Sequence, residues 1–317
     1  MFGKRLVKDM IDRSAENEKD RRTFLKAAGV AGLGVVGASM LHGSAAFADD
    51  SAADGTTAGD ARADGAPTDG AVLNFALNLE YLEAEFYSYA VFGYGLTSAM
   101  TTGKGHHGMV KGGSKVPFKT KRIQQYAREI AGDEIAHVKF LRAALGDSAV
   151  SRPQIDLQNS FTAAARAAGL INSKQTFNPF ASEDAFLLGA FLFEDVGVTA
   201  YKGAAPLIDN KTYLEAAAGI LAVEAYHAGI VRSALYDKGL AAQAAKISDA
   251  RDSLDGNISS DQPIYLGGTA NLVPTDKNGI AYSRSYKRVL NIVYLNPGST
   301  DKGGFYPQGM NGTLRTS

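Results

Sequence analysis

Two Glu-x-x-His motifs constrain the fold of this chain more than any other feature of its sequence. The first is "EIAH", from Glu134 to His137, and the second is "EAYH", from Glu224 to His227. Residues three positions apart lie on one face of an α-helix, so the carboxylate and the imidazole of each motif can reach the same point. The surroundings repeat as well, because "LRAAL" follows the first motif and "VRSAL" follows the second. We therefore expect two long helices that present these side chains to a shared site.

Two further segments each carry a glutamate inside an apolar run. Glu80 lies in "NFALNLEYL" and Glu194 lies in "GAFLFEDVG", and each is followed seven residues later by a tyrosine, Tyr87 or Tyr201. A carboxylate in such a run is costly to bury unless it is paired or coordinates a metal. The order along the chain is therefore a Glu helix and a Glu-x-x-His helix, repeated once, which indicates a duplicated helix pair.

Apolar residues that recur every three or four positions predict four long helices. Their expected bounds are about 70–92, 119–145, 183–205 and 210–239. A helix of about 27 residues is about 40 Å long, so the connection 147–181 can run along a whole bundle, with a short helix near 161–169. The sequence therefore predicts an all-α fold, a four-helix bundle over 70–250 with a long crossover between its second and third helices.

The composition changes on either side of the predicted bundle. Residues 1–48 contain "RRTFLK" and then an uncharged run that ends in "AFA", a pattern typical of a cleaved export signal. Residues 49–69 contain mostly Asp, Ala, Gly and Thr, without a large apolar side chain, so they are interpreted as a disordered linker. In the C-terminal extension, 251–317, apolar residues on one helical face predict a short extra helix over 283–295 that packs on the bundle.

The stretch "RRTFLK" resembles a twin-arginine signal peptide. This resemblance implies export of the folded protein by the twin-arginine translocase, to the periplasm or to another place outside the bacterial cytoplasm. The uncharged run that follows is rich in Ala and Gly and only mildly apolar, so no stable membrane span is expected. An uncleaved membrane tether is the alternative.

The chain contains no cysteine, so a metal would have to be bound by carboxylates and imidazoles. Lys+Arg and Asp+Glu are equal at 33 each, which argues against nucleic acid as a partner. A Glu from each of two helices and a Glu-x-x-His from each of two others form the ligand set of di-iron and di-manganese carboxylate proteins, and these ligands suit iron or manganese. We expect two metal ions, iron first and manganese as the alternative. The expected ligands are Glu80, Glu134, His137, Glu194, Glu224 and His227.

Other polar residues are expected close to these ligands. Glu80 is preferred to Glu83 because only Glu80 repeats the spacing of Glu194 and Tyr201, but Glu83 remains an alternative ligand or an extra carboxylate. Glu85 is expected on another face of the helix. The residues expected around the ligands are Glu83, Tyr87, Tyr201, Arg142 and Arg232. The alternative without metal is a polar core in which a buried glutamate pairs with one of these arginines.

These residues resemble the ferritin-like superfamily, and specifically its bacterial ferritin-like domain proteins, which are related to plant desiccation-related proteins. The resemblance rests on "LNFALNLEYLEAEFY", on both Glu-x-x-His motifs and on "GGFYPQGMNG". It implies a ferritin-like bundle with a dinuclear metal site. Two other histidines, His106 and His107 in "GKGHHGMVKGG", are expected to be exposed in a flexible loop.

The superfamily includes ferroxidases, oxygenases, peroxidases and manganese catalases, so the resemblance implies redox chemistry with O2 or peroxide, in stress protection. The alternative is a desiccation- or stress-associated structural protein in which a metal only stabilises the bundle. A ferritin-type storage shell is disfavoured, because the long loops and the C-terminal tail would obstruct packing into a cage. The sequence leaves the substrate and the oligomeric state open, a homo-oligomer included.

Overall fold

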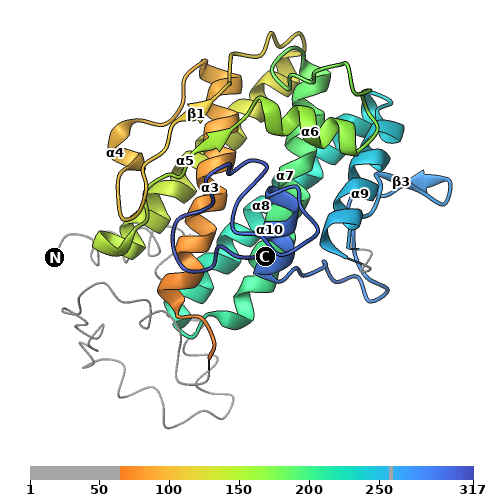
Figure 1. The fold of residues 1–317 in the computed structure, drawn as a ribbon. Coiled ribbons are helices and arrows are strands. Elements are labelled where there is room, and N and C mark those ends of the chain that lie inside the picture. The colour runs from red at the N-terminus through yellow and green to blue at the C-terminus, as the bar shows by residue number, and fades with distance from the viewer. Residues whose placement is uncertain (1–64, 257–259) are drawn as a thin grey trace, which may run out of the picture. The chain divides into compact units, whose positions relative to one another are not determined.

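Four long helices carry the two motifs and the two single glutamates (Figure 1). The computed structural model describes residues 65–256 and 260–317, which belong to one unit, Asp60–Ser317. The predicted signal peptide and nearly all of the predicted linker lie outside the described residues. The long helices are α3 (Asp69–Phe92), α5 (Lys121–Leu145), α7 (Glu183–Ala204) and α8 (Lys211–Asp237). The all-α fold predicted from the sequence is confirmed, with helix bounds within a few residues of those expected.

Local side-chain hydrogen bonds explain where these helices begin. Ser182 accepts a hydrogen bond from the backbone N–H of Ala185 at the start of α7. The Asn210 side chain accepts from two backbone N–H groups in the first turn of α8, and the Thr68 side chain accepts from the N–H of Ala71 at the start of α3. At the other end of α3, Gly93 adopts φ 85°, a left-handed conformation that glycine reaches at low cost and that ends the helix.

The second helix of the bundle runs antiparallel to the first. The guanidinium of Arg128, near the start of α5, lies over the ring of Phe92 at the end of α3. Arg142, near the end of α5, donates a 2.6 Å hydrogen bond to the hydroxyl of Tyr81 in the middle of α3. Even a short connection could join two neighbouring antiparallel helices such as α3 and α5. The connection from α5 to α7 has to be longer.

The third helix runs antiparallel to the first as well. Tyr201 of α7 lies opposite Glu80 of α3, and Glu194 of α7 lies opposite Tyr87 of α3. Since α5 and α7 are both antiparallel to α3, they run in the same direction, and the chain between them must return along the bundle. The long crossover predicted from the sequence is therefore present.

The crossover and the loops contain only short elements, α4 (Ser98–Thr101), η1 (Gly146–Ser148), α6 (Asn159–Ala167) and η2 (Ala205–Leu207). Two small sheets join parts of the chain that lie outside the long helices. In the first, β1 (Val110–Lys111) pairs in parallel with β2 (Ile155–Asp156), which ties the first loop to the crossover. In the second, β3 (Tyr265–Leu266) pairs antiparallel with β4 (Thr269–Ala270). The short helix expected near 161–169 corresponds to α6.

Two helices follow the bundle, α9 (Ala241–Asp255) and α10 (Tyr286–Val293). The second corresponds to the helix expected over 283–295. Of the four apolar residues on its expected packing face, Val289, Leu290 and Val293 are buried and Tyr286 is half-buried. The sequence did not predict α9, which has little amphipathic pattern because several of its buried residues are polar or charged. The expected domain boundary at 250 falls inside this helix. Its Arg251 is fully buried, so tertiary contacts hold this helix in place.

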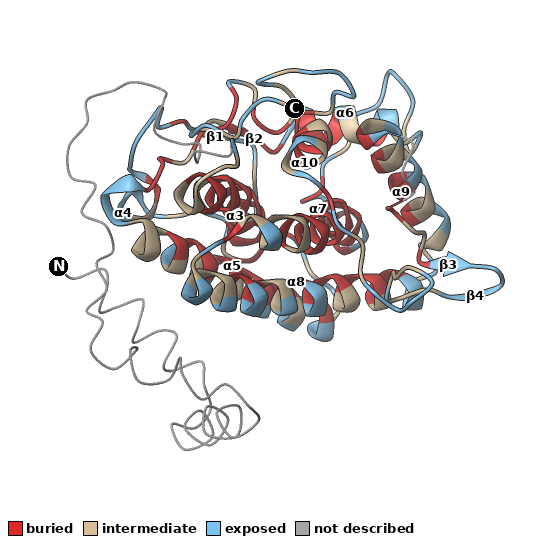
Figure 2. Ribbon diagram, turned by 90° about the horizontal axis from the view of Figure 1, so that it is seen from below, coloured by how far each residue is buried: buried red, intermediate tan, exposed pale blue. Residues whose placement is uncertain are grey.

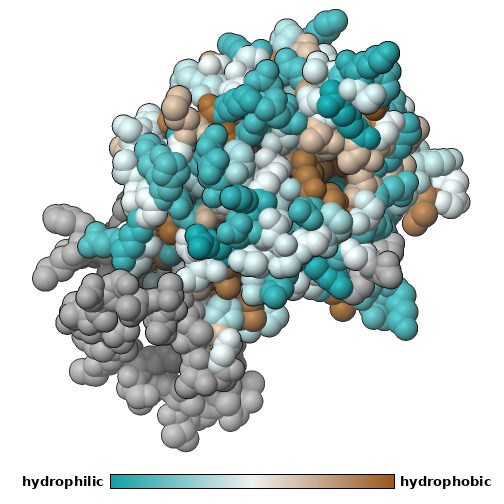
Figure 3. All heavy atoms as spheres, viewed as in Figure 1, coloured by the Kyte–Doolittle hydropathy of each residue, from teal (hydrophilic) through white to brown (hydrophobic). Residues whose placement is uncertain are grey.

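The elements form three layers, which Figure 2 shows from below. The helices α5 and α8 form an outer layer with exposed faces, α3 and α7 are buried in the middle, and α10 with the C-terminal segment covers the other side. The hydroxyl of Tyr306 donates to the backbone carbonyl of Asn78, and the N–H of Asn311 donates to the Asn78 side chain, so the tail is bound to α3. The face shown in Figure 3 is largely hydrophilic, with hydrophobic residues in small groups.

Among the described helices, α8 is the one whose length and composition would allow it to cross a membrane. The same helix carries Glu224 and His227, both buried inside the bundle. Its apolar character is explained in part by the packing of α8 against α7.

Candidate metal centre

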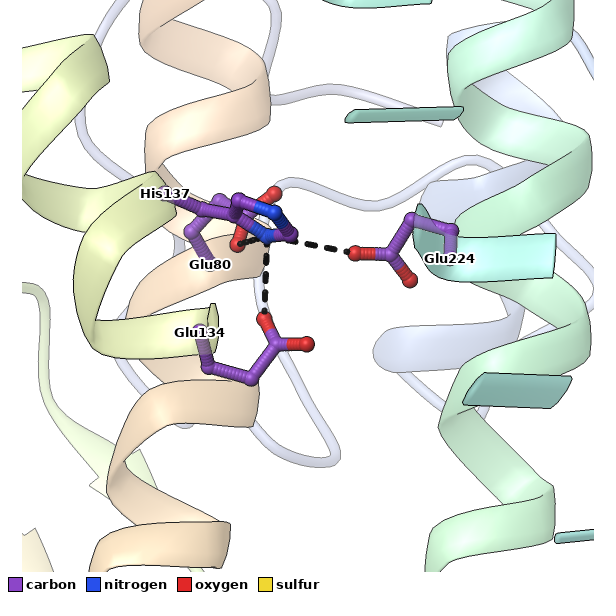
Figure 4. Close-up of side chains that lie close together, drawn as sticks. All are labelled: Glu80, Glu134, His137 and Glu224. Atoms are coloured by element: carbon purple, nitrogen blue, oxygen red, sulfur yellow. Dashed lines mark ion pairs between the residues drawn. The ribbon is translucent and has the colours of Figure 1, made fainter. Parts of the chain in front are cut away.

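The four long helices bring six acidic and imidazole side chains together in the middle of the bundle. Two overlapping groups have ligand atoms close enough to bind a metal ion each. The first consists of Glu80, Glu134, His137 and Glu224, which Figure 4 shows, and the second of Glu134, Glu194, Glu224 and His227. The six residues are at most 8% exposed. We call them the carboxylate–histidine cluster, and they are the residues that the sequence proposed as ligands.

Glu134 lies between the two histidines and directs one oxygen to each. Its Oε2 is 3.6 Å from Nδ1 of His137, and its Oε1 is 3.1 Å from Nδ1 of His227. Glu224 lies 3.6 Å from His137 Nδ1 through Oε1 and belongs to both groups. A carboxylate shared in this way can bridge two cations, so the geometry suits a pair of ions.

The other two glutamates each face a single histidine. Oε2 of Glu80 is 3.2 Å from His137 Nδ1, and Oε2 of Glu194 is 3.6 Å from His227 Nδ1. Their remaining oxygens accept hydrogen bonds from tyrosines, Glu80 from Tyr201 and Glu194 from Tyr87. Each tyrosine therefore donates a hydrogen bond to the glutamate of the opposite helix and not to the one on its own helix.

The donor atoms that face the middle of the cluster lack the hydrogen bonds that buried polar atoms normally make. Within residues 65–256 and 260–317, these buried atoms have no hydrogen-bond partner of good geometry: Glu80 Oε2, both oxygens of Glu134, His137 Nδ1, Glu194 Oε2, both oxygens of Glu224 and His227 Nδ1. Hard carboxylate oxygens with two imidazole nitrogens are a donor set that divalent iron and manganese accept. The residues present therefore fit a metal pair.

Both histidines are basic in the absence of a cation. Burial alone would lower the pKa of His137, but Glu80 and Glu134 outweigh it and raise the pKa to about 11. Burial would also lower the pKa of His227, whereas contacts with Asp133 and Glu134 raise it to about 10. Two imidazolium ions thus balance part of the negative charge, and a metal ion would have to displace these protons.

The carboxylates of the cluster respond to burial in different ways. Burial raises the pKa of Glu80 to about 7 and that of Glu194 to about 8, although each is next to a histidine. Burial and the neighbouring carboxylates raise the pKa of Glu224 well above its usual value. Burial would raise the pKa of Glu134 too, but its contacts with both histidines lower it overall. Such mutual dependence is typical of a site that exchanges protons for cations.

Asp133 is a residue of the site that sequence reasoning missed. Its Oδ2 lies 3.1 Å from Nε2 of His227, and its side chain is 45% exposed. A carboxylate on the outer nitrogen of a metal-binding histidine holds the ring so that the other nitrogen faces the metal. The signal was the acidic pair in "GDEIAH", in which Asp133 directly precedes Glu134. The equivalent position four residues before His227 is Val223, so the repeat is broken here.

The other two glutamates of α3 lie on different faces of the helix. Glu83 is buried one turn beyond Glu80, and burial with the nearby carboxylates raises its pKa well above the usual value. Glu85 points elsewhere, because it pairs with Arg152 and accepts from the backbone N–H of Leu96. This is the division that the helical spacing predicted.

The two arginines that were expected around the cluster bind other partners. Arg142 donates to Tyr81, and Arg232 Nη1 donates a 2.7 Å hydrogen bond to Asp195 Oδ2. Across the described part of the chain, no ion pair joins either arginine to a carboxylate of the cluster. Both guanidinium groups therefore bind acceptors other than the six carboxylate and imidazole side chains of the cluster. The alternative of a core paired by these arginines has no support from the geometry.

A buried ionic network lies next to the cluster on the side of the C-terminal extension. Asp195, which follows Glu194, accepts from Arg232 and from Arg251, at 2.7 Å and 2.8 Å. Arg251 and Arg284 also pair with Asp261 in the segment that precedes α10. The network joins α7, α8 and α9 to the extension.

The remaining two histidines of residues 65–256 and 260–317 lie outside the cluster. His106 and His107 are exposed in the loop before β1, and His107 Nε2 lies 3.0 Å from the hydroxyl of Thr101. This exposure agrees with the prediction that they form a surface loop pair.

Comparisons with known proteins were consistent with this architecture. A family model described as a ferritin-like domain matches residues 68–237. A desiccation-related protein, PCC13-62, from Craterostigma plantagineum is 30% identical over 242 residues, which cover 69% of this chain and 75% of the relative. A ferritin-like catalase, Nec2, from Nesocodon mauritianus is 27% identical over 267 residues, which cover 76% of this chain and 83% of the relative. No solved structure matched.

Proposed function

Because this chain belongs to the ferritin-like domain family, we propose that its carboxylate–histidine cluster holds two iron or manganese ions and reacts with peroxide or O2 in stress protection. The observation that carries the proposal is the pair of overlapping ligand groups that share Glu134 and Glu224. The name of one relative, a ferritin-like catalase, favours peroxide as the reactant. Iron is the first choice of metal and manganese the alternative, because the donor set suits both.

The residues of the cluster would have different roles in binding the two ions. Glu134 and Glu224 would be shared between the two ions, His137 and His227 would each hold one ion, and Glu80 and Glu194 would supply the remaining carboxylates. When bound, the metal pair supplies two-electron redox chemistry, which disproportionation of two H2O2 into two H2O and one O2 requires. The surrounding apolar residues exclude bulk water, which strengthens the electrostatic interactions of the cluster.

Tyr87 and Tyr201 position the terminal carboxylates. Each donates its hydroxyl hydrogen to one oxygen of a glutamate, which leaves the second oxygen for the ion. Burial and the nearby carboxylates raise the pKa of both phenols well above 10, so both remain donors at physiological pH.

We also propose that residues 1–48 direct export through the twin-arginine translocase to the periplasm. The support is the sequence pattern "RRTFLK" followed by an uncharged run and "AFA". Export of a folded protein would allow the metal to be inserted in the cytoplasm first. A fusion of residues 1–48 to a reporter, with Arg21 and Arg22 both changed to Lys as the control, tests this route.

A second candidate function is structural protection during drying, in which the metal only stabilises the bundle. The observation that favours it is the 30% identity to a desiccation-related protein. The two candidates differ in one measurable property, since a structural protein would bind metal without consuming peroxide or O2.

The test uses the mature chain from residue 49, loaded separately with Fe(II) and Mn(II). Elemental analysis should give close to two ions per chain, and the loaded protein should consume peroxide or O2. Glu134→Gln should lose metal and activity together, whereas Glu129→Gln, an exposed position on the same helix, should retain both. Metal without turnover would favour the structural candidate, and the absence of stoichiometric metal would contradict the metal centre.

A further inference from the structure

A long face of α8 is exposed on the outer layer of the bundle and carries no charge over most of its length. From Ala216 to Tyr236, the Asp, Glu, Lys and Arg residues of this helix are Glu224 and Arg232, and both are buried. Only 28% of the most apolar 18-residue stretch of α8 is buried in the structure. The side that points away from the bundle consists of small and apolar residues, Ala218, Ala222, Ala225, Tyr226, Gly229 and Tyr236.

This apolar surface continues from α8 onto the C-terminal extension. The ring of Tyr236 stacks on the ring of Tyr265 in β3, with their centroids 6.4 Å apart. Val273 and Tyr226 line the same groove between α5 and α8 and are 74% and 71% exposed. With Leu266, these are five of the eight large hydrophobic side chains that are exposed in the described part of the chain. We call this surface, together with the α8 positions above, the α8 face. Contiguous exposed apolar surface marks an interaction site.

Polar side chains lie at the two ends of the α8 face. Lys211 and Glu215 are exposed in the first turns of α8, and Ser233 and Asp237 lie in its last turns. A helix turns by about 100° per residue, so all four point to the same side as Tyr226. When two copies of α8 lie antiparallel, one register brings Lys211 level with the partner's Asp237. The same register brings Glu215 level with the partner's Ser233, whose hydroxyl can donate to the carboxylate.

We propose that the α8 face is the interface of a dimer, in which two copies of this chain pack α8 against α8 in antiparallel directions about a two-fold axis. In the register set by the charges, Tyr226 is level with the partner's Ala222, and Gly229 is level with the partner's Gly219. The large aromatic side chain therefore meets a small one, and each contact occurs twice, as a two-fold interface requires. The antiparallel arrangement also brings the opposite ends of the two helix dipoles together.

The face is large enough for a stable dimer. A helix of 27 residues is about 40 Å long, and α8 with one neighbouring element is about 20 Å wide. The footprint is therefore about 800 Å², the area that a stable complex buries on each partner. Its middle is apolar, and the exposed residues Arg122 and Glu129 on α5 supply a polar rim. An apolar centre with a polar rim is the usual composition of such an interface.

A lipid surface fits the α8 face less well than a second copy does. Helices that lie on a membrane carry Lys and Arg beside the apolar side, and Trp, Phe or Leu that enter the acyl region. The exposed positions of α8 between Ala216 and Tyr236 carry Ala, Gly and Tyr, without Lys or Arg. Small side chains of this kind allow the backbones of two helices to approach closely. The composition therefore favours helix packing over insertion into lipid.

The first test measures the molar mass and the dimer dissociation constant by sedimentation, for the full chain and for the chain from residue 49. The unaltered protein should have twice the mass of one chain at micromolar concentrations. Ala222→Glu places two like charges close to the two-fold axis and should raise the dissociation constant about 100-fold or more. Ala163→Glu makes the same change at an exposed position of α6, on the opposite side of the bundle, and should leave it unchanged.

A charge exchange tests the antiparallel register and does not depend on the central substitution. Lys211→Asp faces the partner's Asp237, and Asp237→Lys faces the partner's Lys211, so each should raise the dissociation constant about threefold or more. The protein with both substitutions has the two charges exchanged and should return to within about twofold of the unaltered protein. A double variant that dimerises no better than the single ones would overturn the antiparallel pairing.

Three further outcomes would overturn the proposal. The first is an unaltered protein that is monomeric at every concentration, and the second is a monomer that binds vesicles of anionic phospholipid. The third is a dimer whose dissociation constant is the same with Ala222→Glu as with Ala163→Glu, because its interface would then lie elsewhere. The metal content of each variant is measured separately, so none of these outcomes affects the proposed metal centre.

Discussion

The hydroxyl of Tyr201 on α7 donates a hydrogen bond to Glu80 on α3, and the reciprocal bond from Tyr87 on α3 to Glu194 on α7 completes a symmetric pair. Each terminal carboxylate of the cluster is therefore oriented by the helix opposite to its own. This arrangement makes the position of each ligand dependent on the packing of α3 against α7.

Loss of one of these hydroxyl groups should weaken metal binding. Tyr201→Phe removes the hydrogen bond that holds the Glu80 carboxylate, so this group can rotate. Loss of a residue that orients a metal ligand typically lowers metal affinity about 10- to 100-fold. Titration of the metal-free protein with Mn(II) or Fe(II) measures the change, and Tyr226→Phe, at an exposed position on α8, is the matched control. Identical titration curves for the two variants would show that the hydrogen bond does not orient the ligand.

Removal of Asp133 should affect one metal position more than the other. Asp133→Ala removes the 3.1 Å contact that holds the ring of His227. The matching position on α8 is Val223, whose apolar side chain cannot hold the ring of His137 in the same way. The expected result is one weakened site, with about 10- to 100-fold lower affinity, beside one that is unchanged. Asp133 and Asp237 both line a surface groove between α5 and α8. Asp237→Ala removes the second of these carboxylates from the groove and should leave both metal sites unaltered. Equal weakening in the two variants would point to long-range attraction instead.

The metal-free protein should lose stability as the pH rises. The folded-state pKa values of His137 and His227, about 11 and about 10, lie above the ordinary 6.5. Their contribution to the free energy of unfolding is therefore fully present below pH 6.5 and is lost as the pH rises through 10 and 11. Those of Glu80 and Glu194, about 7 and about 8, are raised above 4.5, and their contribution is lost as the pH passes through 7 and 8.

Both effects have the same sign. The thermal unfolding midpoint, measured in the presence of a chelator, should therefore decrease as the pH is raised from 6.5 to 11. The metal-loaded protein should not show this loss, because metal binding releases the same protons and becomes tighter at higher pH. His137→Gln should flatten the part of the metal-free curve near pH 11. A metal-free midpoint that rises over this range would contradict the assignment of the protons.

The buried ionic network should matter far more for stability than ion pairs on the surface. Arg251→Ala leaves Asp195 and Asp261 buried without one of their partners, which should lower the free energy of unfolding by about 3–5 kcal/mol. Arg122→Ala breaks an exposed 3.2 Å pair with Asp237 and should change it by at most about 1 kcal/mol. Urea unfolding of the metal-free protein measures both, and a similar loss in the two variants would refute the distinction.

Features that depend on neighbouring residues in the chain could be predicted from the sequence. The spacing of Glu134 and His137 determines that both side chains lie on one helical face, and Ser182 and Asn210 determine where α7 and α8 begin. The six residues of the cluster could be proposed because two such local patterns recur in the same order. Helix α9 could not be predicted, because it depends on the buried contacts of Arg251 and has little amphipathic signal of its own.

The sequence by itself determined which side chains each helix offers, because an α-helix repeats its faces at a regular interval whatever surrounds it. Only the tertiary structure decided which helices face each other, so that Tyr201 binds Glu80 and Asp133 supports His227. These contacts join residues that are far apart in the chain, and they depend on how the helices pack, which no local spacing encodes.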